Sequence, residues 1–446
     1  MSIDTNILLI IEVFRAKEKH MRSKMVLFFK NKETRNRLIF TLVMLFVIRL
    51  GSNIPLPHIN AYALLAGVSD NGLIGMMSML GGGVLERFSL FSLGIGPYIT
   101  ASIIIQLLSM DVIAPLAEMA RGGKQGKMKL DKITRYLGAV LAFIQAYSMT
   151  YAFHMNYGIL TNPRLSTFLY IATVLTAGSL LIVWIGDRIS YYGIGNGISM
   201  IIFAGIVSNL PWQFISAYQS LVQSLETTGI VAFALLVLIY VAIIVLVIFM
   251  GEAVRKIPIQ YTSNDMHSGG KELNHLPLKI NSANVTPVIF ASAIMVAPVT
   301  FLSFFAQNVW TKAITNVLSF QKPVGLCIYA ILVVVLAFFY TNMQIDPSKI
   351  ADNLNKRKSY ILGIRPGKDT HTYISNILNR ITVLGALFLM MIAVLPHLLP
   401  MLIPQIPLSV SLGGTGIIIA VGVALETTKE LESKLKQKAY HGFTKR

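Results

Sequence analysis

"GMMSMLGGGVLERFSLFSLGIGPYITASIIIQLLSM", residues 75–110, is broken in a way that is unusual for a membrane segment. The short apolar stretch 73–80 stops at three glycines, and the longer apolar run beyond a charged pair is interrupted by Gly96 and Pro97. Eight residues are too few to cross a hydrocarbon layer about 30 Å thick. Irregular backbone at that depth is tolerated only where it lines a water-filled cavity. The stretch therefore predicts either a re-entrant half-helix hinged at its glycines or an amphipathic helix at the membrane surface.

The composition places the chain among polytopic membrane proteins. Of its 446 residues 54% are hydrophobic and 13% are charged, with a mean hydropathy of +0.65. A soluble globular domain has about 25% charged residues. The single cysteine, Cys327, excludes an internal disulfide framework. The fold class predicted is therefore an all-α polytopic membrane protein.

Apolar runs of about 20 residues predict spanning helices, and ten such runs occur. They are residues 38–56, 88–110, 136–157, 166–186, 194–214, 227–251, 285–309, 323–345, 381–398 and 409–425. The last two are separated by prolines, which disfavour a continuous helix.

The distribution of basic residues predicts that both termini are cytoplasmic. With the N-terminus inside, 33 of the 38 lysines and arginines fall on the cytoplasmic side. The remaining five are Arg49, Arg87, Arg164, Lys312 and Lys322. Residues 1–30 show no cleavable signal and are predicted to be an interfacial helix or a frayed tail.

Ten spans divide into two halves of five, which predicts an inverted repeat of two pseudosymmetric five-helix halves. An odd number of spans per half places the halves in opposite orientations. Two cytoplasmic loops, 251–282 and 344–379, are longer than a connection requires. The predicted organisation is a cytoplasmic segment 1–37, an N-terminal half 38–215, a connector 216–226, a C-terminal half 227–428 and a cytoplasmic tail 429–446.

Enzymatic motifs are missing from the sequence. "GGKQGKMK" at 122–129 lacks the spacing and the hydroxyl of a phosphate-binding loop, and "GIGNG" at 193–197 follows no strand. No H-E-x-x-H occurs, and no span carries paired aspartates or a plausible Ser–His dyad. We expect no catalytic residue, metal or cofactor, so that any energy the protein uses comes from a partner or a gradient.

Six motifs, in order along the chain, resemble the bacterial SecY family, the central subunit of the Sec protein-conducting channel. They are "SLFSLGIGPYITASIIIQLL", "GIGNGISMIIFAGIV", "HLPLKINSANVTPVIFASAI", "FYTNMQIDPSKIADNLNK", "GIRPG" and "SLGGTGIIIAVGVALE". The resemblance implies a passive pore that conducts unfolded polypeptides across the cytoplasmic membrane and releases helices sideways into it.

The resemblance assigns the interrupted stretch to a plug that closes the channel from outside. The plug and its hinge would be Leu73, Met76, Met77, Met79, Leu80, Gly81, Gly82 and Gly83. It also implies a pore constriction made of Ile95, Ile99, Ile198, Ile202, Ile289 and Ile419. A ring of aliphatic side chains resists ions by dewetting and yields to a passing chain.

The resemblance further implies a lateral gate between spans two and three on one side and seven and eight on the other. Its polar candidates are Thr100, Gln106, Gln145 and Ser292. Docking of the ribosome and of the SecA motor is implied for the two long loops, at Arg255, Lys256, Lys271, Arg357 and Arg365. One departure is the loop tip "SNDMHSGGKEL", which has only Lys271 where the family has paired basic residues.

The implied partners are SecE, SecG, the SecA ATPase, the ribosome, signal sequences with their nascent chains, and membrane lipid, but not DNA. Two alternatives stay open: a secondary transporter of the inverted-repeat type, and an accessory SecY paralogue with specialised clients. Transporters usually carry ionisable groups at the membrane midplane. Among the Asp, Glu, Lys and Arg residues, only Arg49 lies within a predicted span, near its outer end. An intramembrane protease is disfavoured because no nucleophile or pair of acids is present.

Overall fold

The fold is given by a computed structural model. It describes residues 31–59, 88–110, 112–222, 227–261, 274–303, 309–320, 322–402 and 408–443. The plug residues and Lys271 lie outside these ranges, as do residues 1–30.

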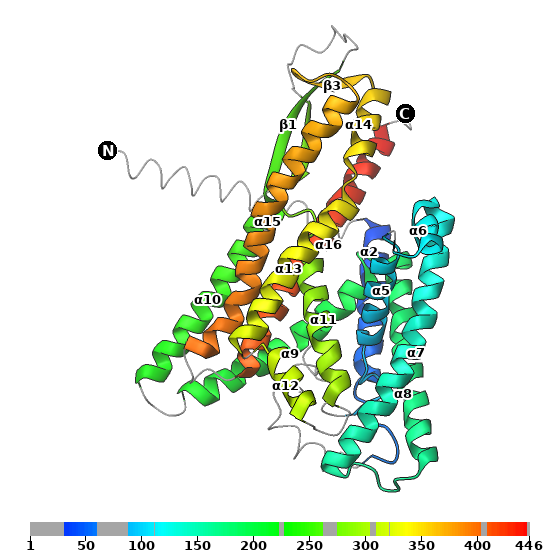
Figure 1. The fold of residues 1–446 in the computed structure, drawn as a ribbon, viewed down its shortest axis with the longest axis vertical. Helices are drawn as coiled ribbons and strands as arrows, with labels where there is room; N and C mark the ends of the chain where they lie inside the picture. Colours follow the sequence, from blue (N-terminus) through cyan, green and yellow to red (C-terminus); the bar gives the residue numbers. More distant parts are fainter. Residues whose placement is uncertain are drawn as a thin grey trace.

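Helices make up most of the described chain (Figure 1) and fall into two groups by sequence, before and after residue 223. The first group contains α2 (Lys32–Gly51), α5 (Gly96–Leu108), α6 (Ala114–Arg121), α7 (Gly123–Tyr157), α8 (Leu165–Tyr192) and α9 (Gly197–Val222). The second contains α10 (Thr227–Glu252), α11 (Thr286–Ser303), α12 (Val309–Val317), α13 (Pro323–Gln344), α14 (Pro347–Lys356), α15 (Lys368–Leu402) and α16 (Leu408–Phe443). Each of the ten predicted spans overlaps a helix; α6 and α14 lie between spans, and α12 begins at the last residue of the seventh span.

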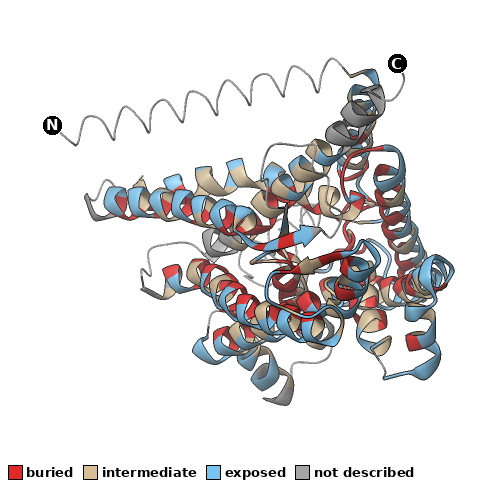
Figure 2. Cartoon of the chain, turned by 90° about the horizontal axis from the view of Figure 1, so that it is seen from above, coloured by how far each residue is buried: buried red, intermediate tan, exposed pale blue. Residues whose placement is uncertain are grey.

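The lengths and surfaces of these helices fit a bilayer. Among the described residues, six helices are long and apolar enough to cross a membrane, and Gly96–Leu108 and Thr286–Val299 are shorter apolar helices. Seen from above, exposed residues lie along the outer sides of the bundle (Figure 2). Many are large and apolar, as on α10, where Leu238 is 64% and Phe249 is 68% exposed. An apolar surface of this extent would be unfavourable in water and is favourable against lipid.

The second span is shorter than predicted. Helix α5 begins at Gly96, not at residue 88, and the segment before it forms turns. Two positive φ angles, 42° at Phe88 and 55° at Gly94, are incompatible with a continuous helix. Phe88 is nevertheless fully buried, edge-on to Phe153 at 5.6 Å between ring centroids. The segment therefore packs as a fixed loop that sets where α5 starts.

Other helix ends also differ from the prediction. The expected connector 216–226 is helical as far as Val222, because α9 continues through it. Helices α7 and α15 begin well before their apolar runs, at Gly123 and Lys368, and so extend beyond the predicted membrane spans. Hydropathy marks the bilayer boundary, whereas a helix ends where its backbone hydrogen bonds end.

The two long loops form a sheet together, which the sequence did not predict. Strands β1 (Val254–Tyr261) and β2 (Asn274–Lys279) pair antiparallel, and β3 (Ser359–Ile361) adds to β1, giving the order β2-β1-β3. The sheet lies at one end of the molecule beside α14 (Figure 1). Its apolar side packs in a cluster of buried residues: Ile257, Ile259, Leu278, Leu354, Ile361, Ile374 and Ile381.

The "GIGNG" turn between α8 and α9 is a packing junction. The Ile194 N–H donates to Thr41 Oγ1 of α2 at 3.1 Å, and the Gly197 N–H donates to Ser190 Oγ of α8 at 2.8 Å. A Cβ on Gly197 would lie 1.9 Å from the Gly186 carbonyl oxygen. These glycines therefore bring three helices into close contact, which gives the motif a structural role.

Gly197→Ala is expected to lower the stability of the folded protein, because the added methyl group would collide with the Gly186 carbonyl. That carbonyl belongs to the backbone of α8 and can move only if the helix moves with it. Overpacking of this kind costs about 1–3 kcal/mol. The measurement is the temperature at which purified protein in detergent loses its monodisperse peak. Gly96→Ala is the matched control, because nothing lies within 4 Å of a Cβ at that position. Equal melting of both variants would contradict the packing role.

Candidate functional site

Five of the six predicted ring isoleucines meet in one apolar cluster. Ile202 and Ile419 are buried at 8% and 2% exposure, and Ile99, Ile198 and Ile289 pack against them. These side chains come from α9, α16, α5 and α11, which belong to both halves of the chain. The cluster therefore lies where the two halves meet.

Ile95 lies in an adjoining cluster that shares Ile99 and Ile198 with the first. It is the residue before the first turn of α5, and the Ile99 N–H donates to its carbonyl at 3.1 Å. One helical turn therefore places both side chains on the same face. The late start of α5 at Gly96 determines which face this is.

Helix α9 supplies the next pair of isoleucines in the same way. The side chain of Asn196 accepts from the Ile198 N–H at 3.1 Å and so caps the first turn. Ile202 follows one turn later. Gly416 lets α16 approach α9 closely, since a Cβ there would lie 2.9 Å from Ile206.

Sequence reasoning missed several neighbours of the ring. Met200, Phe203, Ile206, Ala420 and Val423 belong to the same cluster. Their spacing along α9 and α16 is that of ordinary helix packing, so no local signal separates them from core residues. Among the described residues, no group of three or more His, Cys, Asp or Glu could hold a metal ion. The cluster is made of aliphatic, Met and Phe side chains from both halves of the chain.

The four candidate gate residues have different surroundings. Thr100 donates to the Gly96 carbonyl at 3.1 Å and Ser292 donates to the Ile289 carbonyl at 2.7 Å, each within its own helix. Gln145 lies half-buried on α7. Gln106 reaches across to the other half of the chain: Tyr340 Oη of α13 donates to its Oε1 at 2.8 Å.

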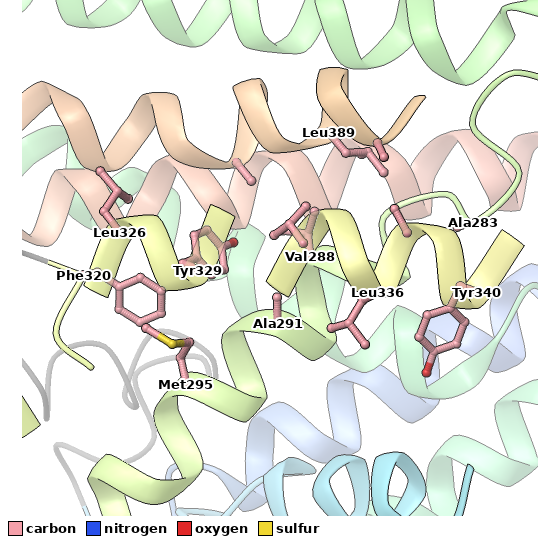
Figure 3. Packing of buried hydrophobic residues seen from close by; sticks show 14 residues of the cluster. Ala283, Val288, Ala291, Met295, Phe320, Leu326, Tyr329, Leu336, Tyr340 and Leu389 are labelled. Atoms are coloured by element: carbon pink, nitrogen blue, oxygen red, sulfur yellow. The ribbon is translucent and has the colours of Figure 1, made fainter. Parts of the chain in front are cut away.

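Tyr340, the hydrogen-bond partner of the gate candidate Gln106, was missed by sequence reasoning. It lies at the edge of a large cluster between α11, α13 and α15, with its oxygen pointing away from Leu389 (Figure 3). Its ring is 3% exposed and edge-on to Phe290 of α11 at 4.9 Å. The span also contains Tyr329, whose buried hydroxyl has no hydrogen-bond partner among the described residues, so the sequence alone does not single out Tyr340.

The predicted docking cations lie on the sheet and its neighbouring turns. Arg255 and Lys256 are exposed on β1, and Arg357 is exposed at the end of α14. Arg365 is exposed in a turn between Gly363 and Gly367, whose φ angles are 79° and 99°. Both glycines adopt the left-handed region that other residues disfavour.

The turn that carries Arg365 is tied to the helix that follows it. Thr370 Oγ1 of α15 donates to the Arg365 carbonyl at 2.8 Å, and the Ile364 N–H donates to the Ile361 carbonyl of β3 at 3.1 Å. The backbone of Arg365 is therefore held on both sides while its side chain stays in solvent.

Two charged groups stabilise the helix ends at this face. Asp346 accepts from the Ser348 N–H at 3.0 Å and so caps α14. Desolvation acts to raise the pKa of Asp346, but hydrogen bonds from Lys349 and Ser348 outweigh it and keep that pKa below its usual range. Lys429 of α16 donates to the Gly251 carbonyl at the end of α10. Partial burial, with the nearby charge of Lys279, lowers the pKa of Lys429.

The sequence profile of the SecY family matches residues 89–428. This chain belongs to the SecY family. The protein translocase subunit SecY of Bacillus subtilis (strain 168) is 46% identical to it, with 94% of this chain and 98% of the relative aligned. SecY of Staphylococcus aureus (strain NCTC 8325 / PS 47) is 42% identical, with 95% and 99% aligned.

Solved structures share the SecY fold. A SecY structure whose description concerns the plug domain and the closed channel matches with a TM-score of 0.65 at 19% identity, covering 90% of this chain and 92% of the other. Sec61 in a canine ribosome–channel complex matches with a TM-score of 0.60 at 15% identity, with the same coverage. At these identities the likeness shows the fold alone.

Proposed function

We propose that this chain is the central subunit of a protein-conducting channel in the bacterial cytoplasmic membrane. Unfolded polypeptides pass through a pore closed by the isoleucine ring, and helices leave sideways through a gate between α5 and α7 on one side and α11 and α13 on the other. The observation that carries this proposal is the convergence of Ile99, Ile198, Ile202, Ile289 and Ile419, from four helices of both halves, in one apolar cluster. Membership of the SecY family supports it.

The chemistry of the ring helices argues against an ion-coupled transporter. α5, α9 and α11 contain no Asp, Glu, Lys, Arg or His, and neither does α16 before Glu426. Ion-coupled transport uses ionisable groups near the midplane. An aliphatic constriction instead passes a flexible chain without binding it.

The remaining assignments follow from the same proposal. Both termini and the β1–β3 sheet lie in the cytoplasm, where SecA or the ribosome docks and supplies the driving force. SecE and SecG complete the channel, and residues 38–215 and 227–428 form its two halves. The residues matching the plug, Leu73 to Gly83, close it from outside. The alternative is an accessory channel of the same kind that exports a narrow set of client proteins. The loop tip around Lys271 favours it, because this tip has few basic residues.

The test is reconstitution of the purified chain in proteoliposomes, with and without SecE and with SecA and ATP. A preprotein should become protease-protected at least tenfold more in the full system than without the chain. The tagged chain should also bring down SecE and either SecA or ribosomes from membranes. Solute uptake driven by an ion gradient, without SecE and without preprotein protection, would overturn the proposal. Depletion followed by a survey of accumulated preproteins distinguishes a general channel from a specialised one.

A further inference from the structure

The ammonium of Lys429 on α16 donates a hydrogen bond to the Gly251 carbonyl at the end of α10. We propose that this bond makes Lys429 a positioning residue of the isoleucine ring, because it fixes the axial position at which α16 holds Ile419 against α9. Lys429 lies ten residues beyond Ile419 and acts on the ring only through the helix. The inference rests on the proposed function, since it takes the isoleucine ring to be the seal of the channel.

The end of α10 is suited to a positive charge. Because α10 ends at Glu252, the Gly251 carbonyl is among the last four of the helix, which have no partner within it. These carbonyls form the negative end of the helix dipole, where a lysine side chain is favourable. The carboxylates of Glu252 and Glu432 also favour the ammonium of Lys429, whereas the nearby charge of Lys279 disfavours it.

The bond lies where α10 passes into the cytoplasmic sheet. Strand β1 begins at Val254, and the Ala253 carbonyl accepts from the Ile280 N–H, directly after β2, at 3.0 Å. Helix α16 comes close at this point, since a Cβ on Gly251 would lie 2.9 Å from Leu425. The end of α10, the base of the sheet and α16 therefore meet in one junction, and Lys429 fastens α16 to it.

The same end of α16 also contacts the first half of the chain. Thr427 Oγ1 lies 3.6 Å from Met200 Sδ of α9. The same oxygen faces the turn before α9, where a Cβ on Gly195 would lie 3.1 Å from it. Met200 packs against the cluster that contains Ile202 and Ile419. A shift of α16 at this end therefore changes its contacts with the helix that supplies other ring residues.

Aliphatic packing alone does not fix the axial position of α16. The ring portion of this helix packs through Ile417, Ile418, Ile419, Ala420 and Val423. Such contacts are non-directional, so a slide by part of a turn replaces one contact with another. A hydrogen bond from an ammonium is directional and short, so it holds one position. Lys429 and Ile419 are about 15 Å apart along one helix, which transmits an axial shift from one end to the other.

Lys429→Met removes the ammonium and keeps the aliphatic stem of the side chain. Loss of a hydrogen bond to a charged group shifts an equilibrium about tenfold or more. Without the bond, α16 should populate shifted positions in which Ile419 no longer fills the ring, so ion flux through the closed channel should rise about tenfold. The measurement uses proteoliposomes that contain the full-length channel without SecA or a nascent chain. Unchanged ion flux would overturn the proposal.

Lys279→Met is the charge-matched control. Lys279 is exposed at the end of β2, beside the same junction, and its charge acts on Lys429. The substitution removes one positive charge and leaves the bond to Gly251 in place, so ion flux should stay at the level of the unaltered channel. An equal rise of ion flux in Lys429→Met and Lys279→Met would show an effect of net charge and overturn the role of the bond.

Restoring the ammonium on folded protein tests the bond directly. Lys429→Cys is made together with Cys327→Ser, which removes the single natural thiol. Alkylation with 2-bromoethylamine rebuilds a side chain of lysine length that ends in an ammonium, whereas iodoethane adds an ethyl group without charge. Aminoethylation should return ion flux to the level of the unaltered channel, and ethylation should not. Equal ion flux after both reactions would overturn the proposal.

A labelling measurement separates this inference from the proposed function. Val423 is 3% exposed in the ring cluster, one turn after Ile419, and Val423→Cys with Cys327→Ser changes the side-chain volume little. A small thiol reagent should react with this cysteine about tenfold faster when Lys429→Met is also present. Unchanged reactivity in a chain that exports preprotein would overturn this inference alone. Faster reaction in a chain that exports no preprotein would overturn the proposed function alone.

Discussion

Ile419→Asn is expected to make the closed channel leak ions. Ile419 is 2% exposed and packs in the ring cluster with Ile202 and Ile99. A buried amide without a partner costs about 1–3 kcal/mol, and water entering the ring would relieve that cost. Each 1.4 kcal/mol changes an equilibrium tenfold, so a rise of about tenfold in open or wetted channels follows. Because the ring then closes less well, preproteins with defective signals should also be exported.

The measurement is ion flux through proteoliposomes that contain the channel without SecA or a nascent chain. Ile419→Leu is the control, because it keeps the volume and the apolar character of the side chain. If Ile419→Asn and Ile419→Leu have the same abundance and thermal stability, the leak of Ile419→Asn is due to water in the ring and not to misfolding. If the Ile419→Asn channel does not leak ions and still rejects defective signal sequences, Ile419 is not part of the constriction.

Arg365→Glu is expected to reduce SecA-driven export at least tenfold while insertion and abundance remain normal. Arg365 is held by its backbone between Gly363 and Gly367, with its side chain in solvent. A guanidinium can bind a carboxylate or phosphate through two parallel hydrogen bonds, and reversal of its charge turns that attraction into repulsion. Arg365→Lys should retain part of the activity, because it keeps the charge but not the planar fork.

The assay is export of a preprotein into membrane vesicles at matched channel levels. Lys368→Glu provides the charge-matched control, because Lys368 is exposed at the first residue of α15, directly after the turn, and its substitution changes the net charge equally. It should leave export within about twofold of the unaltered channel. Full export activity in Arg365→Glu would show that Arg365 is not part of the docking site. An equal loss of export in Arg365→Glu and Lys368→Glu would show that docking depends on the total positive charge of the loop and not on Arg365 itself.

The sequence by itself determined the features that depend on composition and local pattern. Apolar runs of spanning length predicted ten helices, and each overlaps a helix of the structure. The motif resemblance selected six isoleucines, of which five meet in one cluster and Ile95 lies in the next. Such predictions succeed because a bilayer imposes length and polarity directly on each segment.

Only the tertiary structure decided which distant segments pair. Strand β3 joins β1 across about a hundred residues, and the hydroxyl of Tyr340 binds Gln106 across 234. It also decided that α5 starts at Gly96, because the turn at Phe88 is stabilised by burial against Phe153. Hydropathy and helix propensity describe one segment at a time, whereas pairing depends on the shape and polarity of surfaces that meet only in the folded chain. The isoleucine cluster and the three-stranded sheet are each built from segments far apart in sequence, so their geometry belongs to the fold.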